Sequence, residues 1–175
     1  IEIFRGTPMI VQSMVIFYGS AQAFNISLDR TWAAIFIVSI NTGAYMSEIV
    51  RGGILAVDTG QFEAATALGM THGQTMRKVV LPQVVRNILP ATGNEFVINI
   101  KDTSVLNVIS VVELYFTGNT VATQNYQYFP TFTIIAVIYF ILTFTITRIL
   151  RYIERRLDSD TYTTGANQMQ VKEVK

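Results

Sequence analysis

The segment Pro130–Thr147, with the sequence PTFTIIAVIYFILTFTIT, decides the fold class of this chain. It holds no charged residue in 18 positions, close to the roughly 20 apolar residues that a helix needs to cross a bilayer. Four arginines follow within the next nine residues, and basic residues collect at the cytoplasmic ends of membrane helices. The segment therefore predicts a transmembrane helix over about residues 130–150.

The composition of the whole chain supports a membrane protein and excludes several kinds of site. Of the 175 residues, 50% are hydrophobic and 14% are charged, and the mean hydropathy is +0.38. Soluble domains carry roughly 25% charged residues. With no cysteine and one histidine, His72, the chain is expected to have no disulfide, no metal site and no catalytic centre built on these residues. Its net charge of +1 predicts no nucleic-acid partner.

Three further apolar segments extend this to an all-α, polytopic membrane helix bundle. They cover about residues 8–24, 31–50 and 84–101, and together with 130–150 they predict four crossings of the lipid bilayer. Another apolar run, 105–116, has only about a dozen residues. That length favours a re-entrant half-helix over a full crossing.

The distribution of basic residues predicts the orientation. Four crossings place eleven of the 13 Lys and Arg residues on one side and leave only Arg30 and Lys101 on the other. Because basic loops are typically cytoplasmic, we expect a multi-pass protein with the loop 58–83 and the C-terminus in the cytoplasm. The domain then covers residues 1–157, and the polar segment 158–175 is expected to be a disordered cytoplasmic tail.

The loop 58–83 contains two short predicted helices. Residues 62–69, FEAATALG, have high helix propensity and end on a glycine suited to a helix C-terminus. A second helix over 74–80 is expected to stop at Pro82. A loop of this kind either docks a cytosolic partner or packs on its own spans, and pattern alone favours neither. The docking face would be formed by Ala64, Ala65 and Leu68.

A specific spacing of residues lies in this loop. Glu63-Ala64-Ala65 is followed by Gly69 and, after nine more residues, by Val79-Val80-Leu81-Pro82. This pattern resembles the EAA signature of permease subunits in binding-protein-dependent ABC importers, with Val79 in place of the usual isoleucine. In that family the segment forms coupling helices that sit in a groove of the cytoplasmic ATPase. The resemblance implies a type I ABC importer transmembrane domain with a coupling site at Glu63, Ala64, Ala65, Gly69, Leu81 and Pro82.

Four other stretches narrow the resemblance to the polar amino-acid permeases, with the glutamine and glutamate type most similar. They are RGTPMIVQ (5–12), NTGAYMSEIVRGGI (41–54), GNEFVINIKDTS (93–104) and VVELYFTG (111–118). Members normally carry one more span before the RGTP segment, so we expect a first helix to be missing here. The resemblance implies a bacterial inner or plasma membrane location. Its implied partners are two ABC ATPase subunits, a second permease subunit of the same or another kind, and an extracellular substrate-binding protein or fused binding domain.

The sequence contains no G-x-x-x-x-G-K-[ST] motif, which cradles phosphates in ATPases. We therefore expect a translocation subunit that is not an enzyme and binds no cofactor, with ATP and Mg²⁺ used by a separate ATPase chain. The predicted function is ATP-driven import of a polar amino acid by alternating access. The alternatives are an ABC permease for another small solute and an ATPase-independent secondary transporter, although no inverted repeat supports the latter.

Polar residues at membrane depth predict a substrate path, because such groups are costly in a bilayer. Glu95, Asn99 and Asp102 recur on one helix face, and a second stripe with the same helical spacing is formed by Asn41, Tyr45 and Glu48. Facing each other, the two stripes would line a cavity. The candidate path residues are Asn41, Glu48, Asn94, Glu95, Asn99, Lys101, Asp102, Thr103 and Ser104.

A zwitterionic amino acid requires an acceptor for its ammonium group and donors for its carboxylate. Glu95 is the expected acceptor, with Asn94, Asn99 and backbone N–H groups at a helix break near residues 102–104 as donors. The structural alternative is that the charged residues of these stripes pair with one another or with arginines at helix ends.

Overall fold

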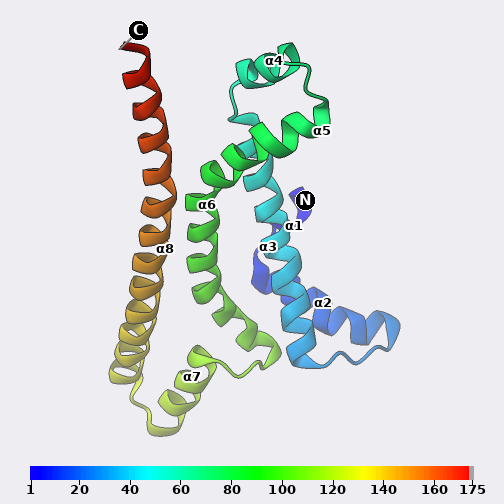
Figure 1. The fold of residues 1–175 in the computed structure, drawn as a ribbon. Coiled ribbons are helices and arrows are strands. Elements are labelled where there is room, and N and C mark those ends of the chain that lie inside the picture. The colour runs from blue at the N-terminus through cyan, green and yellow to red at the C-terminus, as the bar shows by residue number, and fades with distance from the viewer. Residues whose placement is uncertain (174–175) are drawn as a thin grey trace. The chain divides into compact units, whose positions relative to one another are not determined.

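The computed structural model describes residues 1–173, with side chains through Arg156, and the described chain is helical without strands (Figure 1). This confirms the all-α fold class. The elements, in order, are α1 (Glu2–Gly6), α2 (Met9–Phe24), α3 (Arg30–Leu55), α4 (Thr59–Ala67), α5 (His72–Thr75), a π-helix (Met76–Val80), α6 (Leu81–Asp102), a 3₁₀ helix (Thr103–Ile109), α7 (Leu114–Asn125) and α8 (Tyr128–Glu173).

Two of these helices are long and apolar enough to cross a membrane. They are α3 and the part of α8 over Tyr128–Arg156. The helical run His72–Ile109 and α7 pass the same test together as a pair bent by 55°, which raises the number to three. The fourth predicted crossing, 8–24, forms α2, whose 16 residues span about 24 Å, less than the roughly 30 Å of a hydrocarbon core.

Close contacts divide the chain into two compact units, of which the first comprises residues 1–47 and 95–145. Its core lies between the first half of α3 and the 3₁₀ helix. Small side chains on α3 allow the two backbones to approach, and the larger side chains fill the remaining space. The buried members are Ala33, Ala34, Ile37, Leu106 and Ile109.

The second unit comprises residues 48–94 and 146–175. Its core joins the end of α3 to the π-helix and α6 through the buried side chains of Val57, Val80 and Val84. Gly53 of α3 faces α6 so closely that a Cβ atom there would overlap Ile88 and lie 3.4 Å from Val84 Cγ1. A glycine at this position is therefore required by the packing.

The adjacent glycines of α3 provide a stability test. We expect Gly53→Ala to destabilise the protein by about 1–3 kcal/mol, the usual cost of overpacking a filled site. Gly52→Ala should be neutral or slightly stabilising, because nothing lies within 4 Å of a Cβ at Gly52 and alanine favours helix. Thermal unfolding of the purified variants in detergent measures the difference. Equal melting temperatures would contradict the packing of α3 on α6.

The second short helix does not stop at Pro82, contrary to the sequence prediction. Proline in a helix interior lacks an N–H donor and clashes with the carbonyl four residues earlier. Here the preceding turn is a π-helix, in which the Leu81 N–H donates to the Met76 carbonyl five residues back. This wider turn accommodates Pro82 in the first turn of α6, so the helical run continues from His72 to Ile109.

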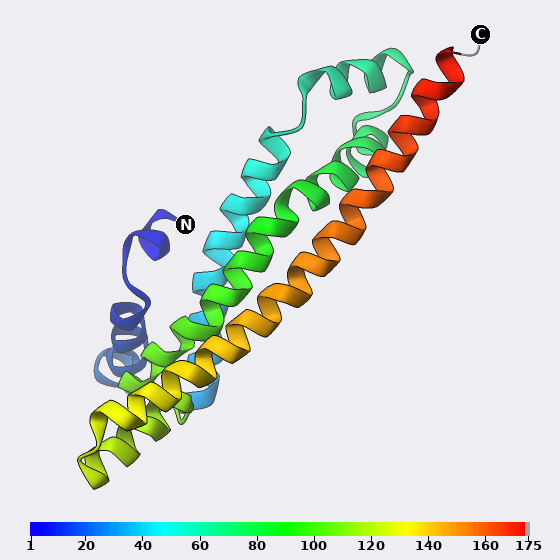
Figure 2. The same ribbon diagram turned by 90° about the vertical axis from the view of Figure 1, so that its left-hand side faces the viewer.

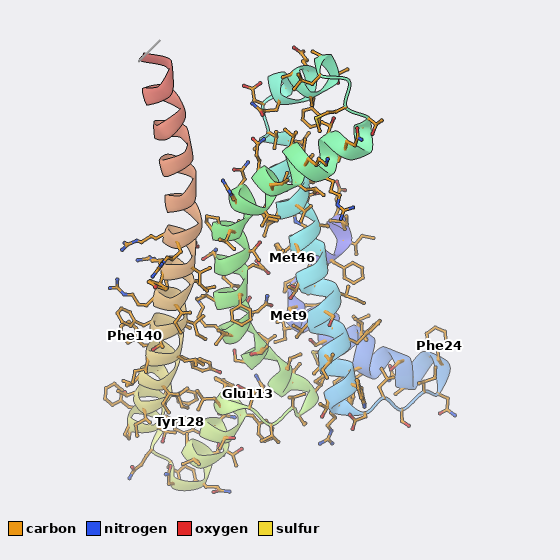
Figure 3. All side chains as sticks on the ribbon, viewed as in Figure 1. Met9, Phe24, Met46, Glu113, Tyr128 and Phe140 are labelled. Atoms are coloured by element: carbon orange, nitrogen blue, oxygen red, sulfur yellow. The ribbon has the colours of Figure 1, made fainter. Side chains whose placement is uncertain are left out.

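The apolar run 105–116 is also not the single half-helix that its length predicts. The 3₁₀ helix ends at Ser110, whose φ of 61° is left-handed. After the break, the carboxylate of Glu113 caps α7 by accepting from the N–H groups of Tyr115 (2.7 Å) and Phe116 (2.6 Å). The Tyr139 hydroxyl of α8 donates to the same carboxylate at 3.1 Å, so Glu113 (labelled in Figure 3) ties the start of α7 to α8.

The helix α8 continues through the segment 158–173, where the sequence predicts a disordered tail. The segment contains no proline and a single glycine, Gly165, so nothing in it ends a helix that is already formed. The last two residues of the predicted tail, 174 and 175, lie outside the described part of the chain.

Candidate functional site

The loop between α3 and α6, residues 56–80, folds into a compact group of short helices (Figures 1 and 2). We call this loop the bracket. The Asp58 carboxylate begins α4 by accepting from the Gly60 N–H at 2.7 Å. Thr71 begins α5 with a capping box, in which its hydroxyl and the Gln74 side chain each accept from the other residue's backbone N–H. Both helix starts are therefore defined by local hydrogen bonds.

Gly69 ends α4 with a left-handed turn, at φ 74°. The Met70 N–H donates to the Ala65 carbonyl (3.1 Å) and the Gly69 N–H to the Thr66 carbonyl (2.9 Å), which together form a Schellman motif. The turn expected from the sequence at this glycine is confirmed. It aims the chain from α4 toward α5 without a longer connection.

The exposed surface of the bracket includes most of the residues expected for coupling. Glu63, Ala64 and Gly69 are exposed, and Leu68 is 81% exposed. Ala65 differs, because it is only 3% exposed and lies one turn after Phe62, which packs on the Val57–Val80–Val84 core. Ala65 therefore packs inside its own unit and does not belong to the exposed docking face. The last two coupling candidates, Leu81 and Pro82, are exposed in the first turn of α6.

A cavity of about 400 Å³ lies in the first unit, between α2, α3 and α6. Both predicted polar stripes contribute to its wall. The lining residues are Thr7, Pro8, Met9, Ile10, Asn41, Tyr45, Glu95, Ile98, Asn99, Asp102 and Val105. Residues from three segments of the chain thus surround one polar space.

A hydrogen-bonded chain crosses the cavity wall from α3 to α6. The Thr42 hydroxyl donates to Asn99 Oδ1 at 3.1 Å. Asn99 Nδ2 in turn lies 3.1 Å from the Glu95 carbonyl and 3.4 Å from Glu95 Oε1. The amide of Asn99 is thereby oriented, and the Glu95 carboxylate retains acceptor capacity, since an ionised carboxylate accepts up to about four hydrogen bonds.

Gln12 lies outside the cavity lining but holds two of its residues, Thr7 and Asn41, a role that sequence analysis missed. It is 7% exposed, and its Nε2 donates to the carbonyls of Phe4 (2.7 Å) and Thr7 (2.8 Å). Its Oε1 accepts from the buried Asn41 Nδ2 at 3.2 Å. A glutamine inside an otherwise apolar run was the available signal, because a buried amide requires several partners.

The remaining path candidates lie in other surroundings. Glu48 forms an ion pair with Arg51, at 2.6 Å from its Oε2 to the arginine NH2. Asn94 and Lys101 are exposed, and the Thr103 hydroxyl donates back to the Ile100 carbonyl at 3.1 Å. The Ser104 carbonyl accepts from Asn107 Nδ2 at 2.6 Å.

The helix break expected near residues 102–104 is absent from the described chain, because the 3₁₀ helix follows α6 directly. The break lies further on, between Ile109 and Leu114. Backbone N–H groups of 102–104 are therefore committed to a continuous helix and do not serve as the donors that were predicted for them.

The chemistry of the cavity suits a small polar solute with a positive group. Its wall carries the carboxylates of Glu95 and Asp102, the amides of Asn41 and Asn99, and the phenol of Tyr45. The Arg5 guanidinium lies over the Tyr45 ring, 5.8 Å from its centre. Carboxylates accept hydrogen bonds from ammonium groups, and amides both donate and accept.

The family profile described as "Binding-protein-dependent transport system inner membrane component" matches residues 1–159 of the chain. Among characterised proteins, the glutamine transport system permease protein GlnP of Escherichia coli is 42% identical over 158 residues, covering 90% of this chain and 72% of that protein. The arginine transport system permease protein ArtQ of Bacillus subtilis is 37% identical, covering 91% of this chain and 73% of its own length.

Solved structures agree with the sequence comparison. A crystal structure of an amino acid ABC transporter with histidines superimposes with a TM-score of 0.83 and 43% identity, covering 89% of this chain and 72% of that one. The inward-facing MetNI methionine ABC transporter matches with a TM-score of 0.75 at 22% identity, covering 89% of this chain and 71% of that one. The second match supports the fold alone.

Proposed function

Because the chain belongs to the family of binding-protein-dependent transport system inner membrane components, we propose that it moves a polar amino acid of the glutamine or glutamate type across the cell membrane by alternating access. The coarser function follows from its relatives: the chain is a permease subunit of an ABC amino-acid importer. The observation that supports the finer proposal is the polar cavity lined by Glu95, Asn99 and Asn41.

The cavity supports recognition of the two charged ends of an amino acid. Glu95 accepts the ammonium group, because its carboxylate faces the cavity and is held from one side by Asn99. The second N–H of the Asn41 amide, whose first N–H donates to Gln12, and the hydroxyl of Tyr45 line the cavity and are placed to donate to the carboxylate or to the polar side chain. No N–H group of a helix break is needed in this arrangement.

The bracket between α3 and α6 supports coupling to ATP hydrolysis. Permeases of this family work with ATPase subunits, and we assign the exposed Glu63, Ala64, Leu68 and Gly69 as the surface that one such subunit contacts. ATP and Mg²⁺ are then used by the ATPase chain. A rigid-body displacement of the bracket tilts α3 and α6, which opens the cavity to one side of the membrane at a time.

The complete importer requires further chains. We propose two ATPase subunits, a second permease subunit, either identical or related, and an extracellular binding protein or fused binding domain that delivers the amino acid. The concentration of basic residues in the bracket and on α8 after its uncharged segment supports a multi-pass orientation in a bacterial plasma membrane with the bracket and the C-terminus in the cytoplasm.

Uptake in reconstituted vesicles tests this function. The complete transporter with its ATPase and binding protein is expected to accumulate labelled glutamine or glutamate when ATP is enclosed with the ATPase, and to transport apolar amino acids poorly. A panel of labelled amino acids identifies the substrate. Uptake that proceeds without the ATPase and follows an ion gradient would overturn the proposal in favour of a secondary transporter.

A further inference from the structure

A dense group of arginines lies on α8 directly after its uncharged segment. Residues 148–156 contain Arg148, Arg151, Arg155 and Arg156 against one acidic residue, Glu154, a net charge of +3. Only 6% of the apolar window of α8 before them is buried, and the labelled Phe140 is 66% exposed (Figure 3). The arginines therefore follow a helix surface of the kind that faces lipid tails.

The arginines share one face of α8. At 100° per residue, the four arginines and Tyr152 fall within an arc of about 140°. Arg156 donates to the Tyr152 hydroxyl through Nε (3.1 Å) and NH2 (2.8 Å), and its guanidinium lies 5.3 Å from the centre of the tyrosine ring. Tyrosine and arginine at the end of a membrane helix are typical of the headgroup region.

The opposite face of the same turns packs within the unit. A Cβ at Gly93 of α6 would lie 3.4 Å from Leu150 Cδ1 and 3.6 Å from Glu154 Oε1. Leu150 and Glu154 thus face α6, and the arginine arc is centred roughly 150° away from them on the helix circumference. The basic face therefore points away from the packed side of α8. Two of its arginines, Arg151 and Arg155, are exposed.

We propose that this basic face of α8 binds the headgroups of anionic phospholipids in the cytoplasmic leaflet. A guanidinium offers a planar pair of donors that matches the oxygens of a phosphate diester, so the exposed Arg151 and Arg155 bind a headgroup by charge and by geometry. Clusters of basic residues next to a membrane helix attract anionic lipid in this way. The site lies outside the cavity and the coupling bracket, and it adds a lipid requirement to the transporter.

Competition between spin-labelled lipids tests the proposal. The full-length chain with its ATPase subunits is reconstituted in phosphatidylcholine vesicles that contain either spin-labelled phosphatidylglycerol or spin-labelled phosphatidylcholine, and the motionally restricted fraction of each is measured. The natural protein should prefer phosphatidylglycerol. R151Q/R155Q should lower that preference at least about fivefold, the share expected for a single basic residue near a membrane surface.

Two matched variants separate a local site from general charge. R151K/R155K keeps both charges and should retain most of the preference, whereas K172Q/K175Q removes two charges from the end of the chain and should retain all of it. The single variant R155Q provides the same test with a smaller change if the double variant does not insert.

An unchanged preference in R151Q/R155Q, or an equal loss in K172Q/K175Q, would overturn the proposal. So would a variant that keeps its lipid preference but releases the ATPase, because the basic face would then bind an acidic protein surface.

Discussion

The transport rate of Gly69→Val should be at least about tenfold below that of the natural protein. The transport rate of Gly73→Val should be almost normal. Gly69 holds a left-handed φ of 74°, which costs a β-branched residue about 1–3 kcal/mol. Space is not the reason, because nothing lies within 4 Å of a Cβ at either glycine. The substitution opens the Schellman turn and displaces Glu63 and Ala64 relative to α5. A cost of about 1.4 kcal/mol already corresponds to tenfold.

The measurement pairs uptake with ATP hydrolysis in the same vesicles. Gly69→Val should leave the amount of inserted protein unchanged and reduce the hydrolysis that the loaded binding protein stimulates. Gly73 is the matched control, since it lies in the same bracket, in the helix α5. Equal uptake by both variants would show that the turn at Gly69 has no role in coupling.

The variant Glu95→Gln should raise the KM for the transported amino acid about tenfold to a hundredfold. A hydrogen bond to a charged group contributes about 1.5–3 kcal/mol, and glutamine keeps the shape of the side chain without its charge. Asn99 can still donate to the glutamine carbonyl, so the wall between α3 and α6 stays intact. Uptake at a series of substrate concentrations separates KM from the maximal rate.

Glu48→Gln is the control for this experiment. Glu48 is the carboxylate of the second predicted stripe, and it is bound to Arg51, whose side chain is 63% exposed. An exposed pair of this kind contributes at most about 1 kcal/mol, so its loss should affect KM little. A KM that rises equally in both variants would argue against Glu95 as the ammonium acceptor. An unchanged KM in Glu95→Gln would exclude an essential contact.

Apolar runs and punctuation residues were enough to predict the long helices. The uncharged run 130–147 is long enough to be interpreted only as a membrane helix, and α8 forms over it. The turn at Gly69 could also be predicted, because a glycine directly after a helix-forming stretch commonly ends the helix in a left-handed cap. The predicted helix end at Pro82 was wrong because the rule that proline ends a helix assumes an α-helical turn before it. The π-helix at Met76–Val80 depends on the hydrogen bond from the Leu81 N–H to the Met76 carbonyl, and no residue type in the sequence predicts this bond.

The cavity needed information beyond one helix. Glu48 and Glu95 look equivalent in sequence, each a carboxylate inside an apolar stretch. Arg51, three residues after Glu48, was the local signal for an ion pair. Gln12 reaches Asn41 across 29 positions of sequence, and such a pairing follows only from the packing of α2 on α3.

The unbroken helical run that begins at His72 has a mechanical consequence. Within it, α6 is about 33 Å long from Leu81 to Asp102 and carries a second proline, Pro90, in its interior. Proline inside a helix removes one backbone hydrogen bond and is a common site of kinks. The run therefore stays helical through both prolines, and Pro90 is the turn of α6 at which the helix bends most easily.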